Sequence, residues 1–360
     1  MESSKSQRVQ WIDALKVLTM LLVIMGHCTY YTINTKFGGI DYPPQNEVSL
    51  FYKLLTFVTT VIYTFHMPLF MAVSGACFSW SIGRYPNVKL LIRNKVHRLL
   101  VPFVLVTTFV SVPLKYISGY YDNSEFVLCD IFYGQYLLMG NSHLWFIVSL
   151  FYIFIIFYYV EKLNIRHKWV YWGVMFTLPL LRIILWNFFE IPGGLLGFSG
   201  MLEYLLFFSI GFSSFKYLDS LPPSTMGYQI ISWIAFLGVI MLTIQLSKCI
   251  ESQVLTQILL YPLYFLKAIW GCINMVCIAK SICKCKWLLQ TKIYQYFKKY
   301  TYELYLYSDP FNYLFIALLS SLFGQYIYMG IFPIYAYSIR FIGTILAAMF
   351  IIRYIHGVSK

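Results

Sequence analysis

Charged side chains are scarce in this chain of 360 residues, in which 14 acidic and 27 basic residues make up 11% of the total. Soluble domains carry about 25% charged residues because a folded surface has to be hydrated. Here 59% of the residues are hydrophobic, and the mean hydropathy is +0.68. This composition excludes a water-soluble globular enzyme and, despite a net charge of +13, a disordered or nucleic-acid-binding chain. It predicts an integral membrane protein.

Several other features are missing. The eight cysteines form no Cys-x-x-Cys pair and lie mostly in apolar runs, where a thiol behaves as a small hydrophobic group. We therefore expect neither a disulfide framework nor a metal site. No small-x-small cleavage site follows the first apolar run, which ends in Gly26-His27-Cys28, so this run predicts a retained helix rather than a signal peptide. The sequence shows no internal repeat and no linker, and it therefore predicts a single domain over residues 1–360.

Ten runs of mainly apolar residues, each about 20 residues long, predict ten transmembrane helices in an all-α integral membrane protein. Their expected bounds are 14–33, 54–80, 96–117, 143–160, 169–188, 201–218, 227–246, 254–279, 301–323 and 333–353. The apolar stretch 126–139 is interpreted as a short interfacial or re-entrant piece. An eleventh span there would place the next basic loop on the wrong side of the membrane.

The basic residues predict the orientation of these spans. If the N-terminus is cytoplasmic, 20 of the 27 Lys and Arg residues lie on the cytoplasmic side, four lie outside and three lie within spans. Cytoplasmic loops of membrane proteins carry an excess of Lys and Arg. We therefore expect both termini in the cytoplasm, and most of the net charge of +13 reflects topology rather than an anionic partner.

The first span carries Asp13, Lys16 and His27 in an otherwise apolar sequence. Lys16 and His27 are eleven residues apart, which is three helical turns plus about 20° and about 16 Å along the axis, so both project from one face. Asp13 lies one turn before Lys16 and could pair with it. One interpretation is that Lys16 snorkels to the headgroups and His27 lies near the outer interface. The other is a cationic anchor at one end and a titratable general base at the other.

The second and third spans carry further polar groups. His66 precedes Pro68, which frees a backbone carbonyl, so this histidine either bonds the loosened backbone or belongs to a site. Arg93, Lys95 and Arg98 belong to a basic run at the start of the third span. The positive-inside bias alone explains such a run, but Arg and Lys at this position also suit the phosphates of a cytoplasmic cofactor.

Polar groups in the later spans give weaker indications. His143 and Trp145 open the fourth span, where Trp145 is most simply an interfacial anchor. Glu203 opens the sixth span and either faces water or bonds a polar ligand. Asp309 lies inside the ninth span beside Pro310, and ionisable residues inside a membrane are functional candidates by default.

Together these residues resemble membrane-bound acyltransferase family 3, the bacterial O-acyltransferases of surface glycans, and within it the fucose 4-O-acetylase-like branch. The matching motifs are Ile12-Asp13-x-x-Lys16 with His27, Phe65-His-Met-Pro-Leu-Phe70 with Ser74-Gly75, Lys95-x-x-Arg98-Leu-Leu-Val-Pro102, His143-Leu-Trp145-Phe146 and Tyr305-Leu-Tyr-Ser308-x-Pro310. Lys16 and Lys95 stand where the family usually has Arg, and Ser308 stands where it often has His.

The resemblance implies transfer of an acetyl or other acyl group from cytoplasmic acetyl-CoA to a sugar hydroxyl, in the bacterial cytoplasmic (inner) membrane. The acceptor would be a glycan precursor, a lipid-linked sugar or a surface polysaccharide, and no nucleic acid is involved. The residues expected in catalysis are His27 and Asp13, those expected at the cofactor are Lys16, Lys95, Arg98 and Arg93, and those expected at the acceptor are His66, Glu203, His143, Trp145 and Asp309.

A glycan flippase or secondary transporter is the main alternative, with the intramembrane residues Lys16, His27, Arg182, Asp309 and Arg340 lining its pathway. The repeats that many transporters show are not visible here. A structural membrane scaffold is a third interpretation, which leaves Lys16 and His27 unexplained. The sequence leaves several points open. These are the acceptor sugar and its hydroxyl, the length of the acyl group, the side on which transfer finishes, direct or acyl-enzyme transfer, and the oligomeric state.

Overall fold

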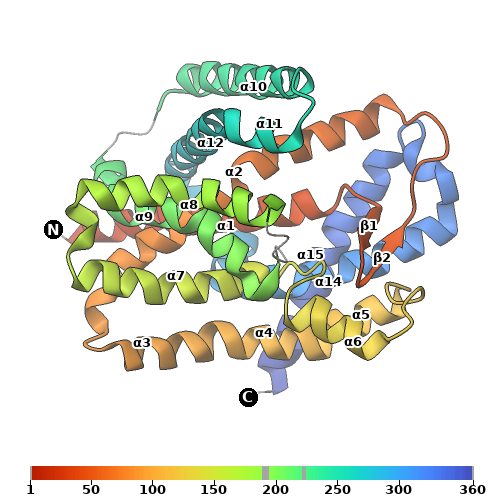
Figure 1. Cartoon of the computed structure of the whole chain (residues 1–360), viewed down its shortest axis with the longest axis horizontal. Helices are drawn as coiled ribbons and strands as arrows, with labels where there is room; N and C mark the ends of the chain where they lie inside the picture. The colour runs from red at the N-terminus through yellow and green to blue at the C-terminus, as the bar shows by residue number, and fades with distance from the viewer. Residues whose placement is uncertain (1, 189–193, 221–223, 359–360) are drawn as a thin grey trace.

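The computed structural model describes residues 2–188, 194–220 and 224–358, and this part of the chain is almost entirely helical (Figure 1). The long helices are α1 (Glu2–His27), α2 (Leu50–Ser81), α7 (Trp145–Lys162), α8 (Trp169–Phe188), α9 (Phe198–Ser220), α10 (Met226–Lys248), α12 (Tyr261–Ile282), α14 (Lys292–Phe323) and α15 (Phe332–Val358). The short helices are α3 (Val88–Lys95), α4 (Val101–Val106), α5 (Val112–Ile117), α6 (Val127–Ile131), α11 (Gln253–Leu259) and α13 (Lys286–Gln290).

The remaining elements are short. A two-stranded antiparallel hairpin consists of β1 (Thr32–Thr35) and β2 (Gly38–Asp41). Single 3₁₀ turns cover Ile82–Arg84, Ile165–His167, Leu195–Gly197 and Gly324–Tyr328, and π-helical stretches cover Val96–Leu100, Thr107–Ser111 and Phe132–Tyr136. Two of the π-helical stretches join α3, α4 and α5 into one helical run over 88–117. The prediction of an all-α fold is confirmed.

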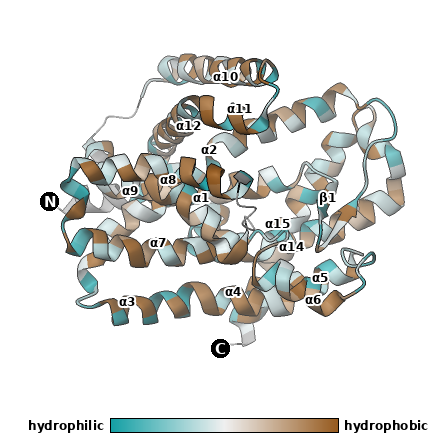
Figure 2. Cartoon of the chain, viewed as in Figure 1, coloured by the Kyte–Doolittle hydropathy of each residue, from teal (hydrophilic) through white to brown (hydrophobic). Residues whose placement is uncertain are grey.

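Nine helical segments among the described residues are long and apolar enough to cross a membrane, so this is a multi-pass membrane protein. Apolar residues run along the helices, and hydrophilic residues gather at helix ends and in loops (Figure 2). The ninth predicted span, 301–323, lies in α14, which falls short of that apolarity. Its buried residues include Ser308, Asp309 and Asn312, so the polar groups that lower its hydropathy face the protein interior.

Two predicted spans have different bounds in the structure. The span expected over 14–33 ends at His27, because Thr32, Ile33 and their neighbours pair in the hairpin, and β-branched residues favour strands. The span expected over 254–279 is divided into α11 and α12 at Leu260, since Pro262 begins the second helix and cannot continue the first. The stretch expected to be interfacial or re-entrant contains the short helix α6 and one π-helical stretch, with no long helix.

Close packing between α2 and α9 forms the centre of the bundle. A Cβ at Gly75 would lie 2.1 Å from the Phe208 carbonyl oxygen, and one at Gly211 would lie 1.9 Å from the Ala72 carbonyl oxygen. Small residues allow two membrane helices to approach to backbone contact. The rings of Phe78 and Phe208 then meet at a centroid distance of 6.0 Å. Gly75 and Gly211 therefore serve the packing of these two helices.

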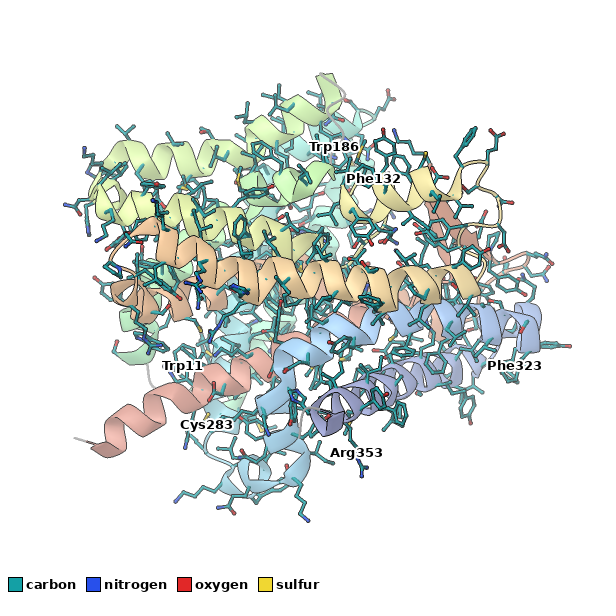
Figure 3. The ribbon with its side chains drawn as sticks, turned by 90° about the horizontal axis from the view of Figure 1, so that it is seen from below. Trp11, Phe132, Trp186, Cys283, Phe323 and Arg353 are labelled. Atoms are coloured by element: carbon teal, nitrogen blue, oxygen red, sulfur yellow. The ribbon has the colours of Figure 1, made fainter. Side chains whose placement is uncertain are left out.

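Helix α1 packs against α2, α12 and α14, which places its ionisable side chains among other helices rather than in lipid. We call the end of the bundle where α1 begins the N-terminal face, and the end where α1 stops at His27 the opposite face. In Figure 3, Trp11 and Cys283 lie left of the centre of the molecule, and Phe323, the last residue of α14, lies at the far right. The N-terminal face and the opposite face each hold one of the groups of polar residues described next.

Candidate active site

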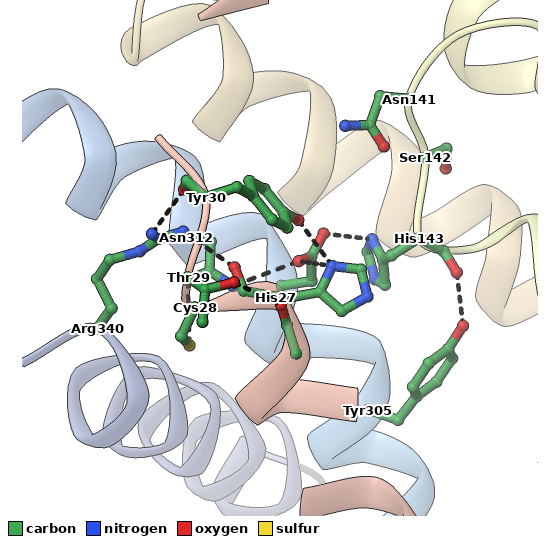
Figure 4. Close-up of polar contacts among 12 residues, drawn as sticks. His27, Cys28, Thr29, Tyr30, Asn141, Ser142, His143, Tyr305, Asn312 and Arg340 are labelled. Atoms are coloured by element: carbon green, nitrogen blue, oxygen red, sulfur yellow. Dashed lines mark hydrogen bonds and ion pairs between the residues drawn. The ribbon is translucent and has the colours of Figure 1, made fainter. Parts of the chain in front are cut away.

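Asp309 contacts two histidines from different parts of the chain, His27 and His143, both of which are labelled in Figure 4. Its Oδ1 lies 2.9 Å from His27 Nδ1, and its Oδ2 lies 3.2 Å from His143 Nδ1. The side chain of Asp309 is 6% exposed and that of His143 is 4% exposed, whereas that of His27 is 18% exposed. The carboxylate is therefore enclosed between two imidazoles, of which His27 is the more accessible.

The three side chains of this site lie on or beside three different helices. His27 is the last residue of α1, His143 lies just before α7, and Asp309 lies within α14 beside Pro310. Arg340 of α15 donates hydrogen bonds to the backbone oxygens of His27 at 3.0 Å and of Tyr30 at 2.7 Å. Since the last carbonyls of a helix lack partners and carry partial negative charge, a buried guanidinium there stabilises the end of α1. The position of His27 thus depends on Arg340.

The contacts of the two imidazoles indicate the hydrogen-bonding roles of their nitrogens. A carboxylate can only accept, so the His27 tautomer that donates Nδ1–H to Asp309 fits this contact, and the Tyr30 hydroxyl lies 2.8 Å from the same nitrogen. His27 Nε2 is then the nitrogen with a free lone pair, as a general base requires. His143 has an acceptor at each nitrogen, Asp309 at Nδ1 and the Leu306 carbonyl oxygen at 3.2 Å from Nε2. The Tyr305 hydroxyl donates to the His143 backbone oxygen at 2.6 Å.

A cavity of about 1340 Å³ extends from His27. Its walls come from α1, α2, α8, α9, α10, α12, the hairpin and the segment before α7. The ionisable or aromatic residues that line it and that the sequence singled out are His27, His66, His143, Trp145, Arg182 and Glu203. The structure therefore brings four of the five residues expected at the acceptor to one cavity, and places Asp309 directly behind two of its histidines.

Three of these lining residues have defined partners. His66 Nδ1 lies 3.0 Å from the Ile62 carbonyl oxygen, so this histidine satisfies the backbone of its own helix as well as lining the cavity. Glu203 pairs with Arg182 Nε at 3.4 Å. Trp145 stacks on Tyr204 with a centroid distance of 5.7 Å and an interplanar angle of 30°. The cavity thus combines an aromatic wall with one carboxylate and one guanidinium.

Asp13 lies in a different place from the one its expected catalytic role requires. Its carboxylate is 3.6 Å from Lys16 Nζ and 3.0 Å from Lys298 Nζ, toward the N-terminal face. It precedes His27 by fourteen residues of continuous helix, which is about 21 Å of axial rise. The pairing of Asp13 with Lys16 is present, but the carboxylate partner of His27 is Asp309.

The residues expected at the cofactor divide into two groups. Cys77 of α2 lies close enough to Lys16 and Lys95 for both ammonium groups to act on its thiol electrostatically. Lys95 points inward, with Nζ 3.3 Å from the centroid of the Phe154 ring. Arg93 and Arg98 are exposed. A regular α-helix would place Lys95 and Arg98, which are three residues apart, on one face, whereas here a π-helical stretch begins at Val96 and changes the direction of the side chains.

Sequence reasoning missed the links between these residues. It named His27, His143 and Asp309 separately, and it mentioned Arg340 only for a transport pathway. The signal that was available is that each is an ionisable group in an apolar segment. Tyr30 and Asn312, whose amide donates to Asp309 Oδ1 at 3.3 Å, carry no such signal in the sequence. In the part of the chain that the structure describes, no three His, Cys, Asp or Glu side chains are arranged around a common metal position.

The protein is thus a bundle of apolar helices that holds a histidine–carboxylate site beside a large cavity. This is a multi-pass membrane protein whose site has the side chains for acid–base chemistry. The family model described as an acyltransferase domain, acyltransferase 3, matches residues 9–353, which is nearly the whole chain. The chain belongs to this family and is an acyltransferase. Curated proteins and solved structures give no significant match. The resemblance found in the motifs is confirmed at the level of the family.

Proposed function

We propose that this acyltransferase moves an acetyl group from acetyl-CoA to a sugar hydroxyl of a glycan precursor or surface polysaccharide, as members of the fucose 4-O-acetylase-like branch do. The observation that carries the proposal is His27, which contacts the Asp309 carboxylate through Nδ1 and lines the cavity. An imidazole held in this way has the geometry of a general base. The proposed location is the bacterial cytoplasmic membrane with both termini inside, and the partners are the lipid bilayer and the glycan.

In the proposed reaction, His27 Nε2 takes the proton of the acceptor hydroxyl as the hydroxyl oxygen attacks the thioester carbonyl carbon. The carbon–sulfur bond breaks, and the departing CoA sulfur takes up the proton from the imidazolium. Asp309 orients the Nδ1–H of His27 and stabilises the positive charge that the ring carries between the two proton transfers. General-base catalysis of this kind typically contributes about 10²–10⁴-fold to the rate.

The donor is proposed to enter at the N-terminal face. Lys16 and Lys95 are suited to bind its phosphates, because both ammonium groups gather near Cys77 at the end of α2. The exposed residues Arg93 and Arg98 lie on the same helical run and suit the nucleotide end of the molecule. Since His27 lies about 16 Å further along α1 than Lys16, the thin pantetheine arm would span this distance to bring the thioester to the base.

The acceptor is proposed to bind in the cavity at the opposite face. Glu203 and Arg182 provide an acceptor and a donor for sugar hydroxyls, and the stacked rings of Trp145 and Tyr204 provide an apolar wall. Binding sites commonly combine a mainly apolar lining with a few polar groups that fix orientation. The flippase or transporter alternative receives no comparable support, because the family to which the chain belongs is defined by acyl transfer.

Mass spectrometry of surface glycans tests the proposal. Cells that express the wild-type protein should carry an acetyl group on a glycan, and cells that express His27→Ala or lack the protein should not. His167→Ala is the matched control, because His167 is exposed in a 3₁₀ turn away from the cavity. Full acetylation with His27→Ala, at an equal amount of protein in the membrane, would disprove the assignment of the base.

A further inference from the structure

Lys267 of α12 is a buried cation with no oxygen partner among the described residues. Its residue is 4% exposed, and it lines the same cavity as His27. The contact that the structure gives its ammonium is the ring of Tyr264, whose centroid lies 4.4 Å from Nζ. Among the described residues, no carboxylate acts on it. A buried ammonium that lacks a counter-ion is unfavourable, and such a group in a membrane protein marks a functional position.

Other deeply buried cations of this protein differ from Lys267. Arg340 donates to two backbone oxygens, Lys115 donates to Gln135 Oε1 at 2.8 Å and to the Asn141 backbone oxygen, and Lys280 donates to the Leu218 backbone oxygen. Each of these three side chains therefore has a structural role in tying two segments together. Lys267 has no such bond to any other segment that the structure describes, so a structural role of this kind does not account for it.

The packing of α12 keeps Lys267 directed inward. Gly271 lies one turn later on the same face, and a Cβ there would be 2.5 Å from Cγ of Phe65 in α2. The thiol of Cys272 contacts the Phe65 backbone oxygen at 3.8 Å. This face of α12 is thus held against α2 beside His66, which also lines the cavity. Because α12 begins six residues earlier at Tyr261, Lys267 lies about 9 Å along the helix, on its protein-facing side.

Among the described residues, the two carboxylates at the cavity contact other groups and not Lys267. Arg182 is paired with Glu203, and Asp309 is held between His27 and His143. We propose that Lys267 binds an anionic group of the acceptor, so that the glycan unit acetylated by this protein carries a carboxylate or a phosphate. This inference rests on the proposed function, and it narrows the acceptor from a sugar to a negatively charged sugar.

The cavity suits such an acceptor better than a second part of the donor. Its volume of about 1340 Å³ exceeds the range of about 300–1,000 Å³ common for small-molecule sites, so it has room for a glycan unit, and Lys267 and His27 both line it. The proposed binding residues for the donor phosphates, Lys16 and Lys95, do not line this cavity. Lys267 therefore acts on the acceptor side.

Binding measurements on the purified full-length protein in detergent test the inference without catalytic turnover. Isothermal titration calorimetry compares glucuronic acid, glucose 1-phosphate and glucose as probes, on wild-type protein and on Lys267→Met, Lys267→Gln and Lys267→Arg. Lys36→Met is the control, because Lys36 is an exposed lysine of the hairpin turn that does not line the cavity. His27→Ala is included because its pocket should still bind the probes.

Wild-type protein, Lys36→Met and His27→Ala should bind one of the anionic sugars at least tenfold more tightly than glucose. A preference for glucuronic acid identifies a carboxylate on the acceptor, and a preference for glucose 1-phosphate identifies a phosphate. Lys267→Met and Lys267→Gln should lose the preference, and Lys267→Arg should keep most of it. Equal binding of all three sugars by the wild type, or an unchanged preference in either neutral variant, overturns the inference. Weaker acetyl-CoA binding by the neutral variants also overturns it, because Lys267 would then belong to the donor site.

Failure of this inference and failure of the proposed function give different results. Loss of glycan acetylation in His27→Ala together with no preference for anionic sugars rejects the role of Lys267 alone. A preference that depends on Lys267, in a protein whose glycans show no change when His27 is replaced, rejects the proposed reaction alone.

Discussion

Replacement of Asp309 by Asn tests the link between the two histidines. The amide has nearly the same shape as the carboxylate but only one acceptor oxygen, and its NH₂ group is a donor. His27 and His143 each present Nδ1 to one carboxylate oxygen, at 2.9 and 3.2 Å, so only one of them can keep an acceptor in Asp309→Asn. We expect the acetyl-transfer rate to fall by about 10²–10⁴-fold, the usual contribution of a general base, which corresponds to about 2.7–5.4 kcal/mol.

The assay is transfer of labelled acetyl from acetyl-CoA to the endogenous acceptor in membrane vesicles that contain equal amounts of each variant. Glu303→Gln is the matched control, because it makes the same chemical change in the same helix, at a partly exposed carboxylate that contacts His356 instead of the site. The double variant His27→Ala with Asp309→Asn should be no slower than His27→Ala alone, since residues that act as a unit are not additive. Transfer by Asp309→Asn within about threefold of the wild type would refute the role of this carboxylate.

Three further predictions concern the donor site, the packing and the end of α1. Lys95→Met should raise the KM for acetyl-CoA, measured in the same vesicles, by about tenfold or more, because a hydrogen bond to a charged group contributes about 1.5–3 kcal/mol. An unchanged KM would show that Lys95 does not belong to the donor site. Gly211→Ala should lower the melting temperature, since its Cβ would lie 1.9 Å from a backbone oxygen and overpacking costs about 1–3 kcal/mol, whereas Gly238→Ala meets nothing within 4 Å and should not. Arg340→Met should lower both the melting temperature and the acetylation rate, because the backbone oxygens of His27 and Tyr30 lose their donor, although Arg340 does not line the cavity. Wild-type values of both quantities would contradict this prediction.

Most of the helices could be predicted from the sequence because a membrane span is defined by length and apolarity alone. The span expected over 169–188 coincides with α8, and the short stretch near 126–139 forms no long helix, as expected. The end of α1 could not be predicted in this way. Hydropathy continues beyond His27, but the chain leaves the helix there to form the hairpin, and this break places His27 beside the cavity.

The partner of His27 could not be predicted for a related reason. Helical periodicity relates residues a few turns apart, and it predicted only the pairing of Asp13 with Lys16, which the structure shows. The contact between His27 and Asp309 joins the first long helix to one near the end of the chain, and only the packing of α1 against α14 brings them together. The π-helical stretch after Lys95 is likewise invisible to a pattern that assumes regular helix.

The central claim is that His27 is the base for acetyl transfer to a glycan. Transfer of labelled acetyl from acetyl-CoA to the membrane glycan, compared between wild-type protein, His27→Ala and the control His167→Ala, tests it most directly. We expect His27→Ala to slow transfer by about 10²-fold or more while acetyl-CoA still binds, and His167→Ala to transfer at the wild-type rate. Labelling of the glycan by His27→Ala at a rate within about threefold of the wild type would contradict the account.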